Sequence, residues 1–223
     1  MNKEKISRRK LMGLGGLGIL GLAGHKALGQ GLMCGLTPPQ TEGPFYPISD
    51  QADKNNDLTI IRGATLEARG RRILIVGQVV DEQCQPVEGA LVEIWQACDT
   101  GRYNHPNDPN PAELDPNFQY WGQDVTDADG RYSFRTIIPG RYPASATWLR
   151  PPHIHYKVHK RGFHELTTQM YFRGDRDNAA DHILRALSHE EQERVLVDFV
   201  ESGTESTLLT GEFNLTIRRV AGA

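Results

Sequence analysis

The segment RPPHIHYKV, residues 150–158, carries two histidines one residue apart in a run that is typical of a β-strand. Side chains of an extended chain alternate between its two faces, so His153 and His155 are expected on one face, with Ile154 on the other. Two neighbouring imidazoles can bind a metal ion together. Two ordinary polar residues on a solvated strand would have the same spacing, so the pair alone leaves both interpretations open.

Four further residues have side chains suited to metal or oxygen chemistry. They are Tyr103 in TGRYNHPND, Tyr142 in IIPGRYPAS, Arg150 before the histidine pair, and Gln169 in LTTQMYF. Each is a weak signal alone, because a tyrosine beside a proline-rich turn usually packs into a core, and an arginine is often a surface residue in an ion pair.

Other catalytic signatures are absent from the sequence, which contains no glycine-rich phosphate loop, serine nucleophile elbow or Cys-x-x-Cys motif. One alternative combines the two histidines with a carboxylate, Asp175 or Glu165, as an Fe(II) triad. That arrangement would leave both tyrosines without a role.

The segments that must position these residues are mostly strand-like. Runs of apolar residues bounded by turn residues predict strands at 73–81, 90–97, 152–160, 166–172 and 211–219. The segment 124–137 is expected to form two strands around a hairpin turn at Asp129-Gly130. A helix is expected over 188–199, where Ser188 can cap its N-terminus. Many short strands predict an all-β protein, an antiparallel β-sandwich with one short C-terminal helix.

The chain divides into three parts at the sequence level. Residues 1–29 have the features of an export signal, residues 30–69 have little periodicity, and residues 70–223 contain the strand pattern. We therefore expect an irregular N-terminal arm over 30–69 that wraps the sandwich domain of 70–223. The arm and the segment 101–120 are expected to line the pocket.

The first part resembles a bacterial twin-arginine signal. Arg8-Arg9 precede an apolar run, residues 11–23, that is shorter than the ~20 residues of a membrane-spanning helix. A small-residue cleavage site at 27–29 would leave Gln30 first. The protein is then expected to be periplasmic or secreted, with no stable membrane span after cleavage; an uncleaved anchor is the alternative.

The overall composition limits the partners of the protein. The 223 residues are 38% hydrophobic and 24% charged, with a net charge of −3. This balance predicts one globular domain without the basic field that nucleic acid binding needs. Of the cysteines at 34, 84 and 98, we expect Cys84 and Cys98 to form a disulfide in an oxidising compartment, the alternative being two buried thiols.

Five segments in order resemble the intradiol ring-cleavage dioxygenases, most closely the iron-bearing subunit of the protocatechuate 3,4-dioxygenase branch. They are TPPQTEGPFYP, GALVEIWQACDTGRYNH, GRYSFRTIIPGRYP, RPPHIHYKV and LTTQMYFRGD. The resemblance covers residues 37–175. It implies a catalytic domain that binds Fe(III), and its ligands map onto the following residues: Tyr103, Tyr142, His153 and His155. Arg150 and Gln169 match residues of that family that face the substrate.

The implied reaction suits these residue types. Ferric iron favours anionic oxygen, and two tyrosinates with a hydroxide would balance its charge inside the sandwich. A catechol can replace the hydroxide and Tyr142, the tyrosinate that leaves in this family, while Tyr103 stays. Dioxygen is then inserted between the hydroxyl-bearing carbons to give a cis,cis-muconate-type diacid. Arg150 would stabilise negative charge, and Gln169 would orient the substrate or dioxygen.

Several alternatives remain open at this level. The substrate is a catechol, with protocatechuate and other substituted catechols not distinguished. The protein could form a homo-oligomer or pair with a second subunit, as protocatechuate enzymes do. The competing hypothesis is an exported β-sandwich binding module, for carbohydrate or a cell surface, in which the metal site is vestigial.

Overall fold

The computed structural model describes residues 34–51, 53–201 and 208–222. The twin-arginine segment of residues 1–29 therefore lies outside the described residues, and its role stays a prediction. Within the described ranges, no helix has the length and apolar character needed to cross a membrane.

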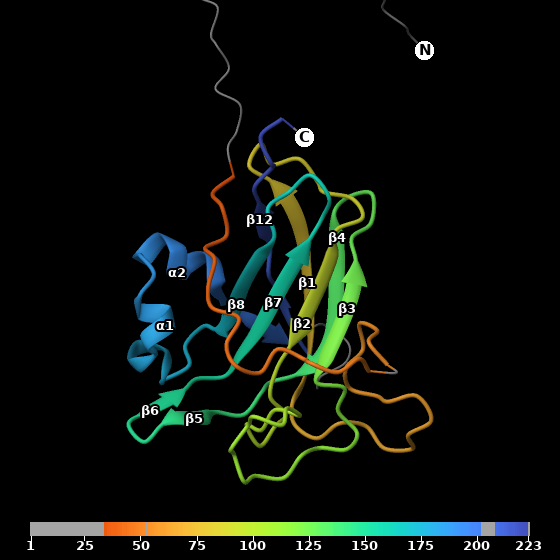
Figure 1. Cartoon of the computed structure of the whole chain (residues 1–223), viewed down its shortest axis with the longest axis vertical. Coiled ribbons are helices and arrows are strands. Elements are labelled where there is room, and N and C mark those ends of the chain that lie inside the picture. Colours follow the sequence, from red (N-terminus) through yellow and green to blue (C-terminus); the bar gives the residue numbers. More distant parts are fainter. Residues whose placement is uncertain (1–33, 52, 202–207, 223) are drawn as a thin grey trace, which may run out of the picture. The chain divides into compact units, whose positions relative to one another are not determined.

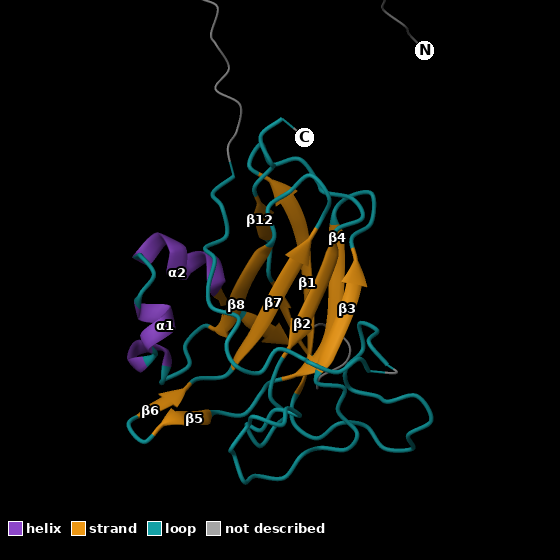
Figure 2. Ribbon diagram, in the orientation of Figure 1, coloured by secondary structure: helices purple, strands orange, loops and turns teal. Residues whose placement is uncertain are grey.

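Two five-stranded sheets form the body of the described chain (Figure 1, Figure 2). In the first sheet, the order is β10 (Phe199–Glu201), β11 (Leu209–Glu212), β1 (Arg72–Asp81) and β12 (Leu215–Ile217), and β4 (Arg131–Ile137) pairs with β1. In the second, the order is β3 (Trp121–Val125), β2 (Leu91–Trp95), β7 (His153–His159), β8 (Leu166–Phe172) and β9 (Leu196–Val197). A separate hairpin joins β5 (Tyr142–Ser145) to β6 (Trp148–Arg150).

The main hydrophobic core lies between the two sheets. Alternate residues of β1 are buried, as expected for a strand with one face on a core. Fully buried side chains from β1, such as Ile73 and Ile75, belong to the same cluster as Ile94 of β2 and Ile154 of β7. The predicted β-sandwich is therefore confirmed.

The strand pairing is less uniform than an antiparallel sandwich. β1 pairs in parallel with both β11 and β12, and β8 pairs in parallel with β9. The segment expected as one strand at 211–219 contributes to both β11 and β12. Asn214 interrupts it, because its side-chain Oδ1 accepts a hydrogen bond from Gln78 N of β1.

The Asp129-Gly130 turn does not join a hairpin. β3 pairs with β2, and β4 pairs with β1, so the turn carries the chain from one sheet to the other. The expected hairpin is therefore wrong, although both strands and the turn exist. Asp127 Oδ1 accepts backbone hydrogen bonds from Asp129 and Arg131, and Gly130 adopts a positive φ of 73° that favours glycine.

The predicted helix begins where its cap was expected. In α2 (His189–Val195), Ser188 and Glu191 form a reciprocal capping box. The helix ends before the expected Phe199, because Leu196 and Val197 leave it to form β9. A 3-10 turn over Asn178–Ala180 and a short helix, α1 (His182–Arg185), were not predicted. Four residues are too few to show a helical period.

The described part of the arm follows the surface of the sandwich, as predicted (Figure 1). Its backbone donates hydrogen bonds from Cys34 to Glu82, from Thr37 to Thr216 and from Gln40 to Thr167. These contacts reach strands or turns of both sheets. The arm is therefore part of the folded domain.

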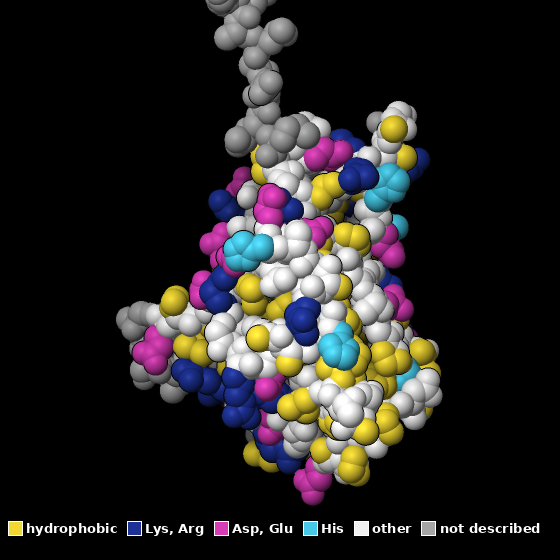
Figure 3. Space-filling model, turned by 90° about the vertical axis from the view of Figure 1, so that its left-hand side faces the viewer, with side chains coloured by type: hydrophobic (Ala, Val, Ile, Leu, Met, Phe, Trp, Pro, Cys, Tyr) yellow, Lys and Arg dark blue, Asp and Glu magenta, His cyan; other side chains and the backbone are white. Residues whose placement is uncertain are grey.

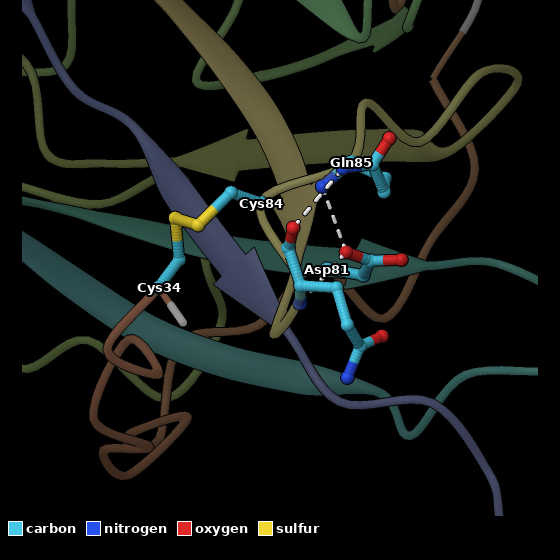
Figure 4. Close-up of a disulfide and its surroundings, with 5 residues drawn as sticks. Cys34, Asp81, Cys84 and Gln85 are labelled. Carbon is cyan, nitrogen blue, oxygen red and sulfur yellow. Dashed lines mark hydrogen bonds between the residues drawn. A yellow bond between two sulfur atoms is a disulfide. The ribbon is translucent and has the colours of Figure 1, made fainter. Parts of the chain in front are cut away.

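The expected Cys84–Cys98 disulfide is wrong. Cys34 of the arm is bonded to Cys84 in the turn after β1, and Cys98 is a buried free thiol (Figure 4). Cys84 and Cys98 lie beyond opposite ends of β2, whose five residues alone span roughly 17 Å. A disulfide needs Cα atoms less than about 7 Å apart, so the pairing with the arm is the one that the fold permits.

Candidate functional site

The histidine pair lies on the outer face of the second sheet. Ile154 and Tyr156 of β7 point into the core between the sheets, so His153 and His155 point the opposite way. The expectation of a centre inside the sandwich is therefore wrong. Both imidazoles are still buried, because the arm and loop residues cover this face.

All four expected metal ligands come together here. The Tyr103 hydroxyl lies 3.4 Å from His153 Nε2. The ring centroids of Tyr103 and Tyr142 are 5.5 Å apart, those of Tyr142 and His153 are 5.7 Å apart, and those of His153 and His155 are 5.0 Å apart. All four side chains are buried. Residues from three separate segments thus form one compact group of two phenols and two imidazoles.

The surroundings fix the orientation of both imidazoles. His153 Nδ1 lies 2.7 Å from the carbonyl oxygen of Pro151, to which it must donate, so Nε2 carries the lone pair. The His155 ring stacks on Trp95, its neighbour across β2 and β7, with centroids 4.8 Å apart and planes 11° apart. His155 Nδ1 is buried and has no hydrogen-bond partner among the described residues.

Residues of the N-terminal arm cover this group of two phenols and two imidazoles. The Phe45 ring packs 4.7 Å from Tyr103 and 6.0 Å from Tyr142, between centroids. Gly43 has a φ of 73°, and a Cβ atom placed there would lie 3.3 Å from Cε1 of His155. Glycine therefore suits both the backbone conformation and the close approach of the arm to the imidazole.

Arg150 is buried, against the alternative of a surface arginine, although it does take part in an ion pair. Its Nε donates to Asp181 Oδ2 at 2.7 Å, and its Nη2 donates to Gln169 Oε1 at 2.7 Å and to Tyr171 Oη at 3.2 Å. Arg150 also faces Tyr142 directly across the β5–β6 hairpin. The guanidinium is thus placed beside one of the two phenols.

Gln169 lies beside the group, and both the oxygen and the nitrogen of its side-chain amide are hydrogen-bonded to protein atoms. It is the cross-strand neighbour of His155. Its Oε1 accepts hydrogen bonds from Arg150 and Tyr171, while its Nε2 donates to the carbonyl oxygen of Thr41 in the arm at 2.9 Å. In this structure, Gln169 links the arm to Arg150.

Burial sets the charge state of the group in the absence of a cation. Burial raises the pKa of Tyr103 well above its ordinary value and raises the pKa of Tyr142, with the Arg150 charge partly offsetting the latter effect. Burial, assisted by the Arg150 charge, lowers the pKa of His153 well below its usual range and that of His155 to about 3. Without a cation the group is therefore neutral near pH 7.

The Fe(II) triad with a carboxylate is not formed. Asp175 forms an ion pair with Arg141, and Glu165 lies 3.6 Å from His159 on the exposed end of the strand. In the ranges that the structure describes, no three His, Cys, Asp or Glu side chains are grouped closely enough to hold a metal ion. The carboxylate alternative therefore has no support among the described residues.

A cavity of about 320 Å³ adjoins the group. Of the four residues, Tyr103 lines the cavity. Phe45 and Trp95, which pack against Tyr103 and His155, line it as well, together with His105 and Trp121. Its walls come from the arm, from β2 and from the loop after β2, as the sequence predicted. A larger hollow of about 620 Å³ lies over β1 and β4 and includes none of the four residues.

Charged side chains of both signs lie close together on this protein. Lys and Arg side chains gather toward the lower left of the face shown in Figure 3, with Asp and Glu side chains among them. Arg141, which precedes β5, pairs with Asp175 and Asp177, which follow β8. These ion pairs connect the β5–β6 hairpin to the second sheet and so help to fix Tyr142.

Comparison with known protein sequences shows the family to which the chain belongs. A family model described as Dioxygenase matches residues 41–218. The chain is 41% identical over 180 residues to the protocatechuate 3,4-dioxygenase beta chain of Burkholderia cepacia, covering 78% of this chain and 76% of that protein. It is 37% identical over 158 residues to catechol 1,2-dioxygenase 2 of Acinetobacter lwoffii, covering 63% of this chain but only 53% of that protein.

Solved structures give the same result. The dioxygenase domain of a dioxygenase carbohydrate-binding protein fusion from Streptomyces sp. SirexAA-E has a TM-score of 0.63 and 28% identity, covering 83% of this chain and 100% of that one. The catechol 1,2-dioxygenase of Acinetobacter sp. ADP1 has a TM-score of 0.64 and 27% identity, covering 83% of this chain and 63% of that one.

Proposed function

Because this chain belongs to the intradiol ring-cleavage dioxygenases, a family of oxidoreductases, we propose that it uses Fe(III) and dioxygen to cleave a catechol between its hydroxyl-bearing carbons. The product would be a cis,cis-muconate-type diacid. The observation that carries the proposal is the convergence of two buried phenols and two buried imidazoles from distant segments. A sandwich without a metal has no evident need of that group.

The donor set fits ferric iron. Phenolate oxygen and neutral imidazole both suit this ion, and the two imidazoles are held in the neutral form by burial. His155 Nδ1 is buried without a hydrogen-bond partner among the residues that the structure describes, so this ring is not fully satisfied by them. We assign the ligand roles to Tyr103, Tyr142, His153 and His155.

The phenols supply the negative charge that the ion requires. Burial keeps both phenols protonated until a cation compensates the cost of ionising them. Binding of the ion would therefore release two protons, one from each tyrosine. When a catechol binds, one of its two protons would go to Tyr142 and the other to the hydroxide that completes the charge balance. Both of these groups would leave, so the charge inside the site stays constant.

Each surrounding residue has a separate task in this proposal. When bound, the ferric ion would withdraw electron density from the catecholate and make a ring carbon reactive toward dioxygen. Arg150 would stabilise the negative charge that develops on substrate oxygen. Gln169 would orient Arg150 and the arm, a role that its contacts support better than direct contact with dioxygen. Phe45 and Gly43 would exclude water from the side of the site that the N-terminal arm covers.

The substrate is proposed to be a substituted or unsubstituted catechol. Similar proteins are a protocatechuate 3,4-dioxygenase beta chain and a catechol 1,2-dioxygenase. The adjoining cavity of about 320 Å³ offers space for a ring with a substituent. Similarity to a beta chain also makes a second subunit a reasonable partner, with a homo-oligomer as the alternative.

The protein is proposed to act in the periplasm or outside the cell. Support comes from the twin-arginine pattern of the first residues and from the Cys34–Cys84 disulfide, which suits an oxidising compartment. Fractionation of cells that express the full chain, with N-terminal sequencing of the exported form, tests this proposal.

The central experiment combines iron analysis, visible spectroscopy and oxygen uptake on the purified protein. We expect one iron per chain, a burgundy colour from tyrosinate-to-iron charge transfer, and oxygen consumption with catechol or 3,4-dihydroxybenzoate. Mass spectrometry should identify the ring-opened diacid with both oxygen atoms from ¹⁸O₂. A colourless protein that binds polysaccharide and consumes no oxygen would instead support the binding-module hypothesis.

A further inference from the structure

We propose that Asp181 and His182 form a clamp that positions the Arg150 guanidinium for the reaction. This inference rests on the proposed function, in which Arg150 stabilises negative charge on the substrate. It adds two positioning residues that lie outside the set of ligands and that the sequence did not indicate. Asp181 binds one edge of the guanidinium, His182 acts on its face through Trp148, and side chains of the second sheet hold its other edge.

Asp181 holds the first edge. Its side chain is fully buried, and Oδ2 accepts a hydrogen bond from Arg150 Nε at 2.7 Å. Its Oδ1 accepts backbone hydrogen bonds from Ile183 at 3.1 Å and from Leu184 at 2.8 Å, which cap α1. Because the cap fixes the carboxylate, Asp181 provides a rigid reference for the direction of the guanidinium.

His182 acts on the face of the guanidinium through Trp148. The Arg150 Cζ atom lies 5.3 Å from the centroid of the Trp148 ring, a cation–π contact. On Trp148, the His182 ring is stacked with centroids 4.7 Å apart and planes 14° apart. His182 is exposed, so this stack holds the Trp148 ring without adding to the core.

The sheet holds the second edge. Arg150 Nη2 donates to Gln169 Oε1 and to Tyr171 Oη. With Nε on Asp181, two guanidinium nitrogens are hydrogen-bonded to protein, and the Arg150 side chain also has a hydrogen-bonding interaction with Tyr142. These contacts therefore hold the guanidinium on the side of Tyr142, the residue that Arg150 faces across the hairpin and that is proposed to give way to the substrate.

The clamp would matter because the rate depends on the exact position of the Arg150 guanidinium. A displacement of about 1 Å of a positioning group can lower a rate by about 100-fold. Arg150 has a long side chain with several rotatable bonds, so its position depends on contacts beyond its own backbone. Asp181 and His182 are adjacent residues at the start of α1. The position of α1 would therefore help to set the position of the Arg150 side chain at the end of β6.

The test uses Asp181→Asn and His182→Ala, each prepared as iron-loaded protein. Asp81→Asn is the matched control, because Asp81 is also buried, accepts a hydrogen bond from Arg219 Nε at 2.8 Å and caps a turn through Gln83 and Gln85. That pair lies at the disulfide-bearing turn and not at the site. His182→Phe preserves the stack and serves as the conservative variant.

Two readouts separate positioning from general loss of structure. The first is kcat and KM for 3,4-dihydroxybenzoate or catechol, whichever the wild-type protein cleaves. The second is the dissociation constant of 4-nitrocatechol, measured from its visible spectrum without oxygen, which needs no turnover. Thermal melting of every variant records stability, and Asp181→Asn is also measured in the Arg150→Lys background.

We expect Asp181→Asn to lower kcat by about 10- to 100-fold. His182→Ala should lower it by about 3- to 10-fold, and His182→Phe should restore it to within about twofold. Both Asp181→Asn and His182→Ala should weaken 4-nitrocatechol binding, whereas Asp81→Asn should change neither readout beyond about twofold. In Arg150→Lys protein, Asp181→Asn should have almost no further effect on kcat, because both changes act on one group.

The inference is overturned if His182→Ala retains wild-type kcat and 4-nitrocatechol binding. It is also overturned if Asp81→Asn lowers both readouts as much as Asp181→Asn does. The His182 variants keep the test valid if Asp181→Asn fails to fold. A wild-type protein without iron or oxygen uptake would instead refute the proposed function itself.

Discussion

Tyr142 and Arg150 lie directly opposite each other across the β5–β6 hairpin, and both side chains are buried. Burial raises the pKa of the Tyr142 phenol, and the Arg150 charge acts against that rise. The hairpin thus places the Arg150 guanidinium next to Tyr142, the tyrosine that is proposed to exchange with substrate. A substitution of either residue should therefore alter the properties of the other.

Replacing Tyr142 by Phe should remove one proposed ligand while keeping the packing of the ring. We expect the visible band of the iron-loaded protein to lose intensity, and turnover to fall by about 100-fold or more, because the proton-accepting phenolate is missing. Absorbance spectra and oxygen uptake measure both effects. Tyr156→Phe is the control, since Tyr156 is a buried tyrosine on the core face of β7. Unchanged colour and rate in Tyr142→Phe would rule out the ligand assignment.

Replacing Arg150 by Met should destabilise the fold as well as the site. The change leaves the fully buried Asp181 carboxylate without its cation, and breaking a buried pair in this way costs about 3–5 kcal/mol. Urea denaturation measures the free energy of unfolding. Adding Asp181→Asn to Arg150→Met should recover part of that loss, because the unpaired charge is removed. A double variant less stable than Arg150→Met alone would contradict this explanation.

Strand positions were largely predictable from the sequence because one face of each strand is buried. The period of two along β7 was enough to place His153 and His155 on a common face. Which face that was, and which strands would be neighbours, depended on contacts between distant segments. For this reason, the centre expected between the sheets lies outside them, and the turn at Gly130 joins two sheets.

The candidate ligands could be predicted from the sequence, whereas the residues that hold Arg150 beside them could not. Tyr103 and Tyr142 stand in segments that resemble a known family, although no local pattern links them to the histidines. Asp181 has no such signal, since a capping aspartate before a helix of four residues looks like any turn residue. Its role follows only from the hydrogen bond to Arg150, 31 residues away in sequence.

The stability of the iron-free protein should fall as the pH is lowered from 7 to 5. Burial lowers the pKa of His153 well below its usual range and that of His155 to about 3, so the folded state takes up no proton at these sites in this interval. Unfolded histidines, with a pKa near 6.5, do take up protons, so acid favours unfolding. This linkage predicts a loss of about 2 kcal/mol for each histidine.

Urea denaturation at pH 7, 6 and 5 checks this pH dependence. A His155→Gln variant should show roughly half of the histidine contribution, because one of the two linked protons is removed. Lowering the pH to 5 leaves most carboxylates ionised, which limits their share of the change. A free energy of unfolding that stays constant between pH 7 and 5 would show that the two imidazoles are accessible to protons in the folded state.

Removal of the Cys34–Cys84 disulfide should destabilise the protein, because the cross-link restricts the unfolded chain and ties the arm to the turn after β1. The bond joins residues separated by 50 positions, for which chain entropy predicts a stabilisation of about 4 kcal/mol. The double variant Cys34→Ser, Cys84→Ser should therefore unfold at a lower urea concentration. Cys98→Ala is the control, because Cys98 is a free buried thiol whose removal leaves the cross-link intact. Thiol labelling of denatured, unreduced protein should modify Cys98; labelling of Cys34 instead would mean that Cys84 pairs with Cys98 after all.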